Sequence, residues 1–295
     1  MLQSMRKDSE SFVDPEKTFQ GVIVITVPHM DDEVLACGGT IALLPDKDRI
    51  HLIYASDGSQ SPAPALPGID SASPDLSRIR VKESKRALKL LGVPEKNLHF
   101  LNFPEARLSC SQEELSRSLV ERIKTINPDH IFTPFRYDRH PDHLVVNRAT
   151  TEAFKAGLFK GHLIEYFVYH RWRLLPGGDV RKYIQPRHLI RINIQQTSAI
   201  KRQALCCFKS QTTQFYPWQD RPILSQTLLD EECYNPELFL RYHPSFLGSS
   251  VFANSTAWIR LVHLIETPLK RKKDKCRALL YRFRHRRTVD DPLRH

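Results

Sequence analysis

Several features that mark particular protein classes are missing from this sequence of 295 residues. Its six cysteines include no C-x-x-C pair, and a chain of this length does not need disulfides to stabilise its core, so reduced thiols are predicted. No stretch approaches the roughly 20 apolar residues that span a bilayer. Residues 1–17 are polar and charged, unlike a signal peptide or a membrane anchor. These absences favour a cytoplasmic protein.

Acidic residues are outnumbered, but the excess positive charge is confined to one segment. Residues 267–295 contain 11 Lys or Arg against three Asp, a net +8 of the chain's +11. Charge confined in this way, without a recognition motif, argues against a specific nucleic-acid partner. Basic residues interleaved with apolar ones instead favour a helical tail on an anionic membrane surface, with a solvated tail as the alternative. Such a tail would place the protein peripherally at the inner membrane surface.

Composition and pattern together predict the division of the chain into segments. Hydrophobic residues make up 41% and charged residues 26%, which is typical of a soluble globular protein, and the length suits one main domain. We expect a mobile lead-in at 1–18, a single domain at 19–266 and the basic tail at 267–295.

The stretch from Gly21 to Gly39 contains the most informative pattern. Residues 21–27 form a continuous apolar, β-branched run, as in a strand that is buried on both faces of a parallel sheet. A cluster of titratable side chains follows, and an apolar helix is predicted at 34–44. Ligands of open α/β sheets bind at such turns, outside the carboxyl end of a strand. The cluster comprises His29, Asp31, Asp32 and Glu33.

The alternation of strands and helices continues to about residue 209. It predicts an open α/β sheet in which parallel strands are joined by helices. The stretch 59–74, without periodicity, is either a lid or a tolerated surface insertion. Beyond Trp218 the pattern weakens. Further strands are predicted at 50–55, 99–103, 130–134, 163–170 and 189–194, and further helices at 76–91, 115–125, 144–159 and 197–209.

A second polar cluster, with His140, Asp142 and His143, follows the predicted strand at 130–134. Parallel strands joined by helices bring their carboxyl ends to one edge of the sheet, so the two clusters should meet. A catalytic zinc site commonly has three His or carboxylate ligands and an open position for water. The clusters could provide a His, Asp, His set, in which His29 is joined by one acidic neighbour. Two groups would remain for proton transfer and oxyanion stabilisation.

Each signal alone has a simpler explanation. A run of acidic residues is common at a helix N-terminus, where it interacts favourably with the helix dipole. Arg80 and Glu83, one turn apart in the helix predicted at 76–91, could form a surface salt bridge. The joint presence of both clusters at strand ends favours the metal site and a hydrolase acting on an amide. A metal phosphoesterase is the other enzyme class considered, although its two-metal sites usually need more carboxylates.

The motifs resemble those of the LmbE/PIG-L family of zinc-dependent N-deacetylases. Residues 29–33, H-M-D-D-E, resemble the family's H-P-D-D-E signature, and residues 140–143 match its H-P-D-H. Weaker similarities span roughly residues 22–211. They comprise Asp57-Gly58, Arg80 with Glu83 as R-x-x-E, Phe103-Pro104-Glu105 as F-P-D, and Ser210-Gln211 as S-Q.

The resemblance implies a Rossmann-like α/β fold, with a mostly parallel sheet covered by helices on both faces, as well as an activity, a cofactor and a role for each matched residue. It implies removal of the N-acetyl group from an N-acetylglucosamine-type conjugate, small molecule or glycolipid, with one zinc ion per chain. His29, Asp32 and His143 resemble the zinc ligands, and Asp31 the general base. His140 resembles the oxyanion stabiliser and the acid that protonates the leaving amine. Arg80 and Glu105 fall at positions implied to contact substrate.

Two positions depart from the family pattern. Met30 replaces the usual proline, which removes a φ restraint from the ligand loop but no ligand. Glu105 replaces aspartate and so lengthens a substrate-side carboxylate by one methylene. The second change could alter which sugar conjugate fits.

Overall fold

The computed structural model describes residues 12–62, 74–138, 140–168, 186–216, 219 and 221–243. The predicted basic tail lies outside these residues, as does most of the 59–74 stretch, so both stay predictions. Residues 15–18 at the end of the predicted lead-in form a short helix, and the Val13 N–H donates to the Arg191 carbonyl. Over the described part of the chain, no helix combines the length and apolar character needed to cross a membrane.

Within the described residues, seven strands form one sheet in the order β3-β2-β1-β4-β5-β7-β6. The first five are parallel, whereas β7 pairs antiparallel with both β5 and β6. The predicted Rossmann-like, mostly parallel sheet is therefore confirmed. The strands are β1 (Ile23–Val27), β2 (Ile50–Ser56), β3 (Leu98–Phe103), β4 (His130–Pro134), β5 (His162–Tyr166), β6 (Leu189–Ile192) and β7 (Glu237–Arg241).

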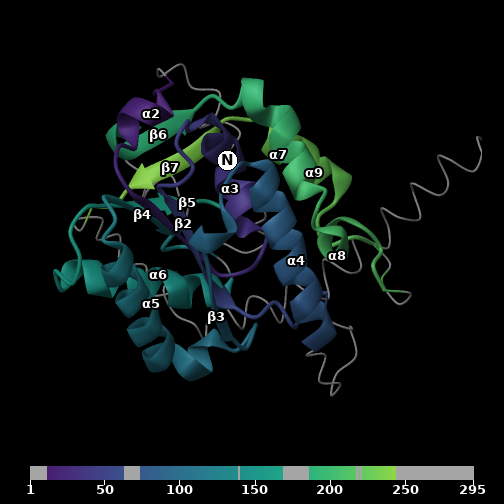
Figure 1. The fold of residues 1–295 in the computed structure, drawn as a ribbon, viewed down its shortest axis with the longest axis horizontal. Helices are drawn as coiled ribbons and strands as arrows, with labels where there is room; N and C mark the ends of the chain where they lie inside the picture. The colour runs from purple at the N-terminus through teal and green to yellow at the C-terminus, as the bar shows by residue number, and fades with distance from the viewer. Residues whose placement is uncertain are drawn as a thin grey trace, which may run out of the picture.

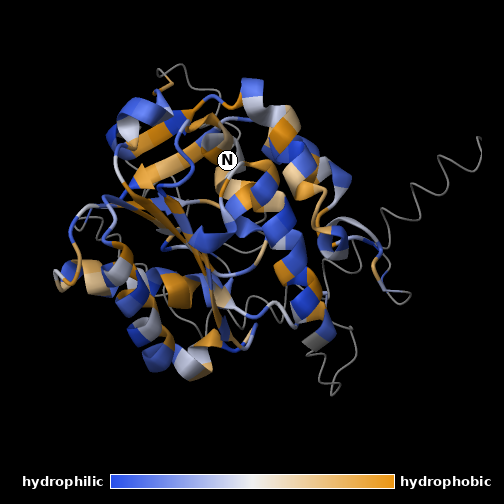
Figure 2. Ribbon diagram, in the orientation of Figure 1, coloured by the Kyte–Doolittle hydropathy of each residue, from blue (hydrophilic) through white to orange (hydrophobic). Residues whose placement is uncertain are grey.

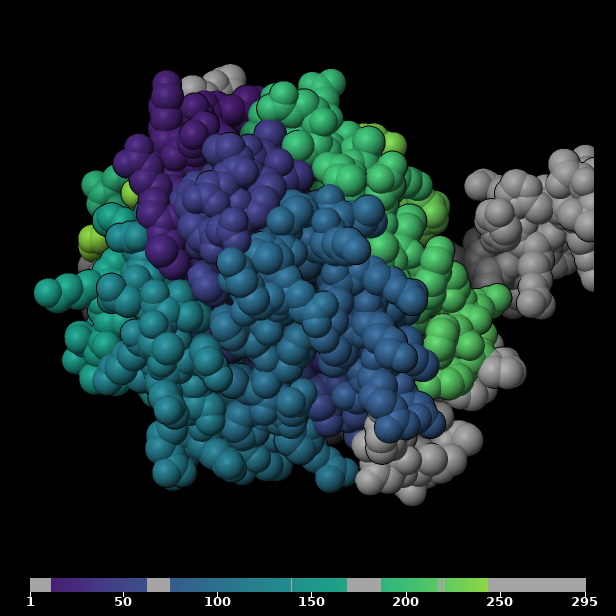
Figure 3. Space-filling view, in the orientation of Figure 1, coloured from purple at the N-terminus to yellow at the C-terminus, as the bar shows by residue number. Residues whose placement is uncertain are grey.

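Helices cover both faces of the sheet, as predicted (Figure 1). Side chains of α3, α4, α7 and α9 pack on one face, and those of α5 and α6 on the other. In the space-filling view the blue surface of α4 adjoins the green surface of α7 (Figure 3). The α-helices of the described part of the chain are α2 (Pro15–Thr18), α3 (Asp32–Leu43), α4 (Pro74–Leu90), α5 (Gln112–Ile126), α6 (Pro141–Lys155), α7 (Ser198–Leu205), α8 (Lys209–Thr212) and α9 (Gln226–Tyr234).

The core lies between the sheet and these helices. All five residues of β1 are buried, with Ile23, Ile25 and Val27 facing the α3 side and Val24 the α5 side. This two-faced burial explains the continuous apolar run of the sequence. Hydrophobic colour is correspondingly concentrated on the central strands, and hydrophilic colour on outer helices such as α4 (Figure 2).

Several elements differ from the sequence-based expectation. The helix predicted at 197–209 is shorter: α7 ends at Leu205, the chain turns at 206–208, and the separate helix α8 begins at Lys209. The predicted strand at 163–170 ends at Tyr166 within the described residues. Strand β7 and helix α9 were not predicted. The segment E-L-F-L-R has only three apolar residues between two charged ones, so it is too short to show a period from which a strand could be assigned.

A buried ion pair joins α7, β7 and α3. Lys201 Nζ lies 2.7 Å from Glu237 Oε1 and donates to the Leu35 carbonyl at 2.8 Å. The Glu237 carboxylate accepts the N–H groups of Gly39 at 2.7 Å and Thr40 at 2.8 Å. Because Leu35 C=O and Gly39 N–H would pair with each other in a regular helix, the ion pair supports α3 at its middle turn. That helix begins at the first polar cluster.

We expect Lys201→Met to lower the free energy of unfolding by about 3–5 kcal/mol, because it leaves the Glu237 charge buried without a counter-ion. The control is Lys96→Met, which removes an ion pair with Asp48 whose side chains are 72% and 73% exposed. That variant should lose less than about 1 kcal/mol. Urea unfolding measures the free energy of unfolding of both variants. Equal losses would show that the buried ion pair contributes no more to stability than the exposed one.

Candidate active site

The two polar clusters meet at the carboxyl ends of β1 and β4, as the sequence predicted. These strands are neighbours, and the chain leaves β1 toward β2 on one side and β4 toward β5 on the other. This reversal of strand order is the switch point at which open α/β sheets bind ligands. His29 follows β1, and His140 caps the N-terminus of α6 after β4.

Three potential ligand atoms converge there. His29 Nδ1 lies 3.2 Å from His143 Nε2, and Asp32 Oδ2 lies 3.3 Å from the first atom and 3.1 Å from the second. Ligands about 2.0–2.1 Å from a tetrahedral zinc ion would be separated by roughly 3.3 Å. The triangle formed by these three atoms, His29 Nδ1, Asp32 Oδ2 and His143 Nε2, therefore fits the coordination of one small divalent ion. The three residues are nearly inaccessible to solvent: His29 is 5% exposed, and Asp32 and His143 are 0% exposed.

Each of these histidines has a carboxylate behind it. His29 Nε2 lies 3.1 Å from Asp142 Oδ2, and His143 Nδ1 lies 3.2 Å from Asp138 Oδ2. Such partners fix the ring orientation and tautomer of metal-binding histidines. The Ala106 N–H in turn donates to Asp142 at 2.8 Å. No role was assigned to Asp138 from the sequence. Its position two residues before the H-P-D-H motif was the one sequence feature that pointed to the site.

The electrostatics of the triangle favour a positive charge. Burial alone would lower the histidine pKa values, but hydrogen bonds to Asp142 and Asp32 raise the pKa of His29 well above its usual range. Burial of His143 is likewise outweighed by Asp32 and Asp138, which raise its pKa to about 9. Asp32 Oδ1 is buried and has no hydrogen-bond partner among the described residues. A bound cation could replace the positive charge of the protonated histidines and interact with Asp32 Oδ1. Its binding would release the histidine protons at neutral pH.

His140 lies against the triangle. Its ring packs edge-on against that of His29, with centroids 4.5 Å apart, and one ring nitrogen is within 4.8 Å of ligand atoms of His29 and His143. The three imidazoles are thus an alternative ligand set, but the shorter distances include Asp32. His140 Nδ1 accepts the Asp142 N–H at 3.2 Å. Burial and the two neighbouring histidines lower the pKa of His140 to about 3, so the ring is neutral and the proton is on Nε2.

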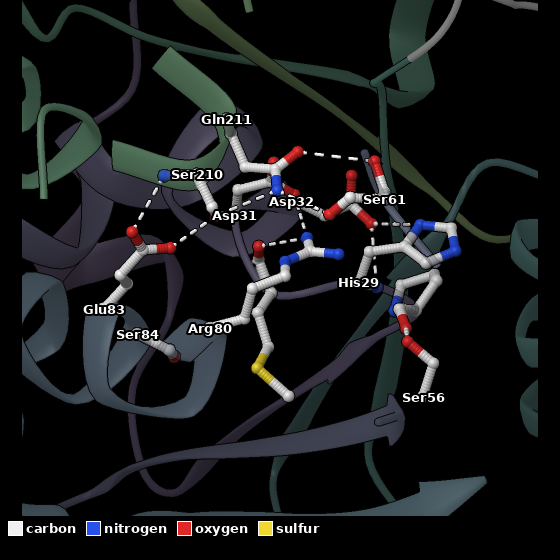
Figure 4. Close-up of polar contacts among 12 residues, drawn as sticks. His29, Asp31, Asp32, Ser56, Ser61, Arg80, Glu83, Ser84, Ser210 and Gln211 are labelled. Atoms are coloured by element: carbon white, nitrogen blue, oxygen red, sulfur yellow. Dashed lines mark hydrogen bonds and ion pairs between the residues drawn. The ribbon is translucent and has the colours of Figure 1, made fainter. Parts of the chain in front are cut away.

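The Asp31 carboxylate contributes none of the three ligand atoms but contacts Arg80 of α4. Its Oδ1 lies 3.5 Å from Arg80 Nη2, and Figure 4 shows Arg80 beside it. Burial raises the pKa of the Asp31 carboxyl well above its ordinary value, although the Arg80 charge opposes the shift. The two adjacent aspartates therefore have different surroundings: Asp32 lies with the histidines, and Asp31 with the guanidinium.

The weaker motifs form a hydrogen-bonded network beside the site. Arg80, only 1% exposed, pairs with Glu105 at 2.9 Å and not with Glu83, so the surface salt bridge considered from spacing is wrong. Glu83 instead accepts the Ser210 N–H at 2.8 Å and hydroxyl at 2.6 Å (Figure 4).

The same network includes the loop after β2. Glu105 Oε2 accepts the N–H groups of Gln60 at 2.6 Å and Ser61 at 3.0 Å. Gln211 Nε2 donates to the Ser61 carbonyl at 2.8 Å (Figure 4). The extra methylene of Glu105 thus serves contacts within the protein. Its role in substrate binding, like that of Arg80, stays a prediction.

Comparisons with known proteins connect this site to a family. Residues 24–154 match the family model described as PIG-L, GlcNAc-PI de-N-acetylase. The chain is 31% identical over 134 residues to the probable N-acetyl-alpha-D-glucosaminyl L-malate deacetylase 2 of Bacillus cereus, covering 44% of this chain and 60% of that protein. It is 30% identical over 140 residues to the uncharacterized deacetylase YaiS of Escherichia coli, covering 45% of this chain and 68% of that protein.

A solved structure has the same fold. The N,N'-diacetylchitobiose deacetylase of Pyrococcus horikoshii superposes with a TM-score of 0.55 at 20% identity, over 82% of this chain and 90% of that one. Fold and site together define an α/β protein with a buried histidine–carboxylate group, able to hold a divalent metal, at the switch point of its sheet. The family model and the relative from Escherichia coli show that the chain belongs to the LmbE/PIG-L family. It spans 60% of the length of the Bacillus relative.

Proposed function

We propose that the protein is a zinc-dependent hydrolase that removes the N-acetyl group from an N-acetylglucosamine-type conjugate. The observation that carries this proposal is the triangle of His29, Asp32 and His143, with Asp31 and His140 left over beside it. Family membership supports the reaction, since both relatives are deacetylases by name and one acts on an N-acetylglucosaminyl compound.

Zinc suits the donor set, because two imidazoles and one carboxylate leave a coordination position open for water or substrate. When bound, the ion would lower the pKa of a water molecule toward about 7 and polarise the amide carbonyl. His29, Asp32 and His143 would hold it, and Asp142 and Asp138 would orient the two rings.

The remaining residues would move protons and stabilise charge. Asp31 takes a proton from the water that attacks the acetyl carbon, and the neutral His140 donates a hydrogen bond from Nε2 to the developing oxyanion. The C–N bond then breaks and the leaving nitrogen takes a proton, giving acetate and a free amine. We assign this proton to Asp31, because a second proton on His140 would place an Nδ1–H against the Asp142 N–H.

A panel of N-acetylglucosamine conjugates that carry inositol, malate, a second sugar or a lipid tests the proposal. The zinc-reconstituted full chain should release acetate and free amine in equal amounts from at least one of them, and chelator treatment should stop the reaction. A generic phosphomonoester and random-sequence DNA serve as controls for the other classes considered. Release of phosphate without acetate, or salt-dependent DNA binding without any hydrolysis, would refute the deacetylase.

A further inference from the structure

The peptide group between Met30 and Asp31 is hydrogen-bonded by an ionisable side chain on each side. Its carbonyl oxygen, on Met30, accepts a hydrogen bond from Arg80 Nη2 at 2.6 Å. Its N–H, on Asp31, donates to Glu33 Oε2 at 2.9 Å. Arg80 comes from α4 and Glu33 from the first turn of α3, so two elements fix the plane of this one peptide. The bond from the Arg80 guanidinium is charge-assisted, and such hydrogen bonds are roughly twice as strong as neutral ones.

The residue that follows this peptide has a strained backbone. Asp31 has φ 138° and ψ −25°, a conformation that a non-glycine residue rarely adopts, and its side chain makes no capping hydrogen bond to α3. Such strain costs about 1–3 kcal/mol and persists only where the surrounding structure imposes it. Because φ sets the direction of the side chain relative to the preceding peptide, fixing that peptide also fixes where the Asp31 carboxylate points.

Glu33 is itself held in place by buried groups. Its Oε1 accepts the Tyr54 hydroxyl from β2 at 3.0 Å, and the Ser84 hydroxyl from α4 donates to the Tyr54 oxygen at 2.7 Å. Glu33, Tyr54 and Ser84 are all 0% exposed, and the Tyr54 ring stacks on Phe100 with centroids 4.7 Å apart. The carboxylate of Glu33 therefore has little freedom to leave the Asp31 N–H.

We propose that Glu33 is a positioning residue, which acts with Arg80 as a clamp on the Met30–Asp31 peptide and so aims the Asp31 carboxylate. Met30 stands where the family motif usually has proline, so φ of this residue lacks the proline restraint, and the clamp fixes the peptide that follows it. The clamp also gives Arg80 a structural task besides the substrate contact expected of it. The link to catalysis rests on the proposed function, in which Asp31 is the base.

A double-mutant cycle tests whether Glu33 acts through Asp31. Glu33→Leu removes both acceptor oxygens and should lower kcat about 10- to 100-fold per metal-loaded chain. In an Asp31→Asn background the same change should lower kcat less than about 2-fold further, because the base is already lost. Tyr54→Phe, which removes one hydroxyl only, should show the same pattern with a smaller fall, and it keeps the test decisive if Glu33→Leu does not fold. Equal falls in both backgrounds would overturn the proposal.

The matched control is Glu83→Leu. Glu83 is also a buried carboxylate that accepts a backbone N–H and a hydroxyl, but both belong to Ser210 and neither to the clamped peptide. Any fall in kcat that this variant causes should be the same in both backgrounds.

Crystal structures of metal-loaded Glu33→Leu and Tyr54→Phe provide a readout that does not depend on activity. We expect Asp31 to leave its positive φ and its carboxylate to rotate away from Arg80 in Glu33→Leu, with a smaller shift in Tyr54→Phe. An Asp31 that keeps its φ and side-chain position in both variants would overturn the clamp, whether or not the wild-type protein releases acetate. Absence of acetate release by the wild-type protein would refute only the proposed function.

Discussion

His143→Ala is expected to reduce the metal content of the purified protein from about one ion per chain to below about 0.1, with loss of measurable hydrolysis. Three-ligand sites tolerate the loss of a ligand poorly, and this change also leaves the buried carboxylates of Asp32 and Asp138 facing an empty volume. Elemental analysis of the purified variant, together with acetate release, measures the effect.

His140→Ala is the matched control, since it removes an imidazole of the same cluster that is assigned to the oxyanion. Its metal content should stay near one ion per chain, while kcat falls about 10²–10³-fold, as for the loss of one oxyanion donor. Full occupancy in His143→Ala would contradict the ligand assignment. Loss of metal from both variants would instead favour the three imidazoles as the ligand set.

Asp31→Asn should keep a normal metal content while kcat falls by about 10²–10⁴-fold, the usual contribution of a general base. The substitution preserves the size of the side chain. It removes the ability to take up a proton together with the charge beside Arg80, which keeps its ion pair with Glu105. KM should change little, because the lost interaction operates mainly in the transition state. Single-turnover kinetics on metal-loaded enzyme separate this effect from weaker substrate binding.

Asp32→Ala should behave in the opposite way. It removes an oxygen that lies 3.1–3.3 Å from both histidine nitrogens, so metal affinity should fall and excess zinc should restore part of the activity. If Asp31→Asn lacks metal while Asp32→Ala retains it, the two roles are exchanged. A fully active Asp31→Asn would place the base elsewhere.

Much of the fold could be predicted from the sequence because burial leaves a strong pattern. The apolar run of β1 reflects a strand that is covered on both faces, and the polar residues after β1 and β4 mark the carboxyl edge of the sheet. Parallel pairing then brings His29 next to His143 without further information. The antiparallel strand β7 could not be found, because its partners β5 and β6 are distant in sequence and its own pattern is five residues long.

Within the site, residue type identified the groups that could bind a metal, but not how they are supported. Nothing in the spacing of Glu33 shows that its carboxylate turns back to the Asp31 N–H and away from the histidines. The pairing of Arg80 with Glu105 joins residues that are 25 positions apart, whereas spacing suggested Glu83 as the nearer partner. Such contacts depend on how β2, α3 and α4 pack, and helical periodicity does not contain that information.

The position of the ion itself tests the metal site most directly. Crystals of the zinc-reconstituted protein, measured on both sides of the zinc absorption edge, should give one anomalous peak per chain. That peak should lie within about 2.0–2.2 Å of His29 Nδ1, Asp32 Oδ2 and His143 Nε2, with Asp31 outside bonding distance. A peak bound by Asp31 in place of Asp32, or one away from the ends of β1 and β4, would contradict the proposed site.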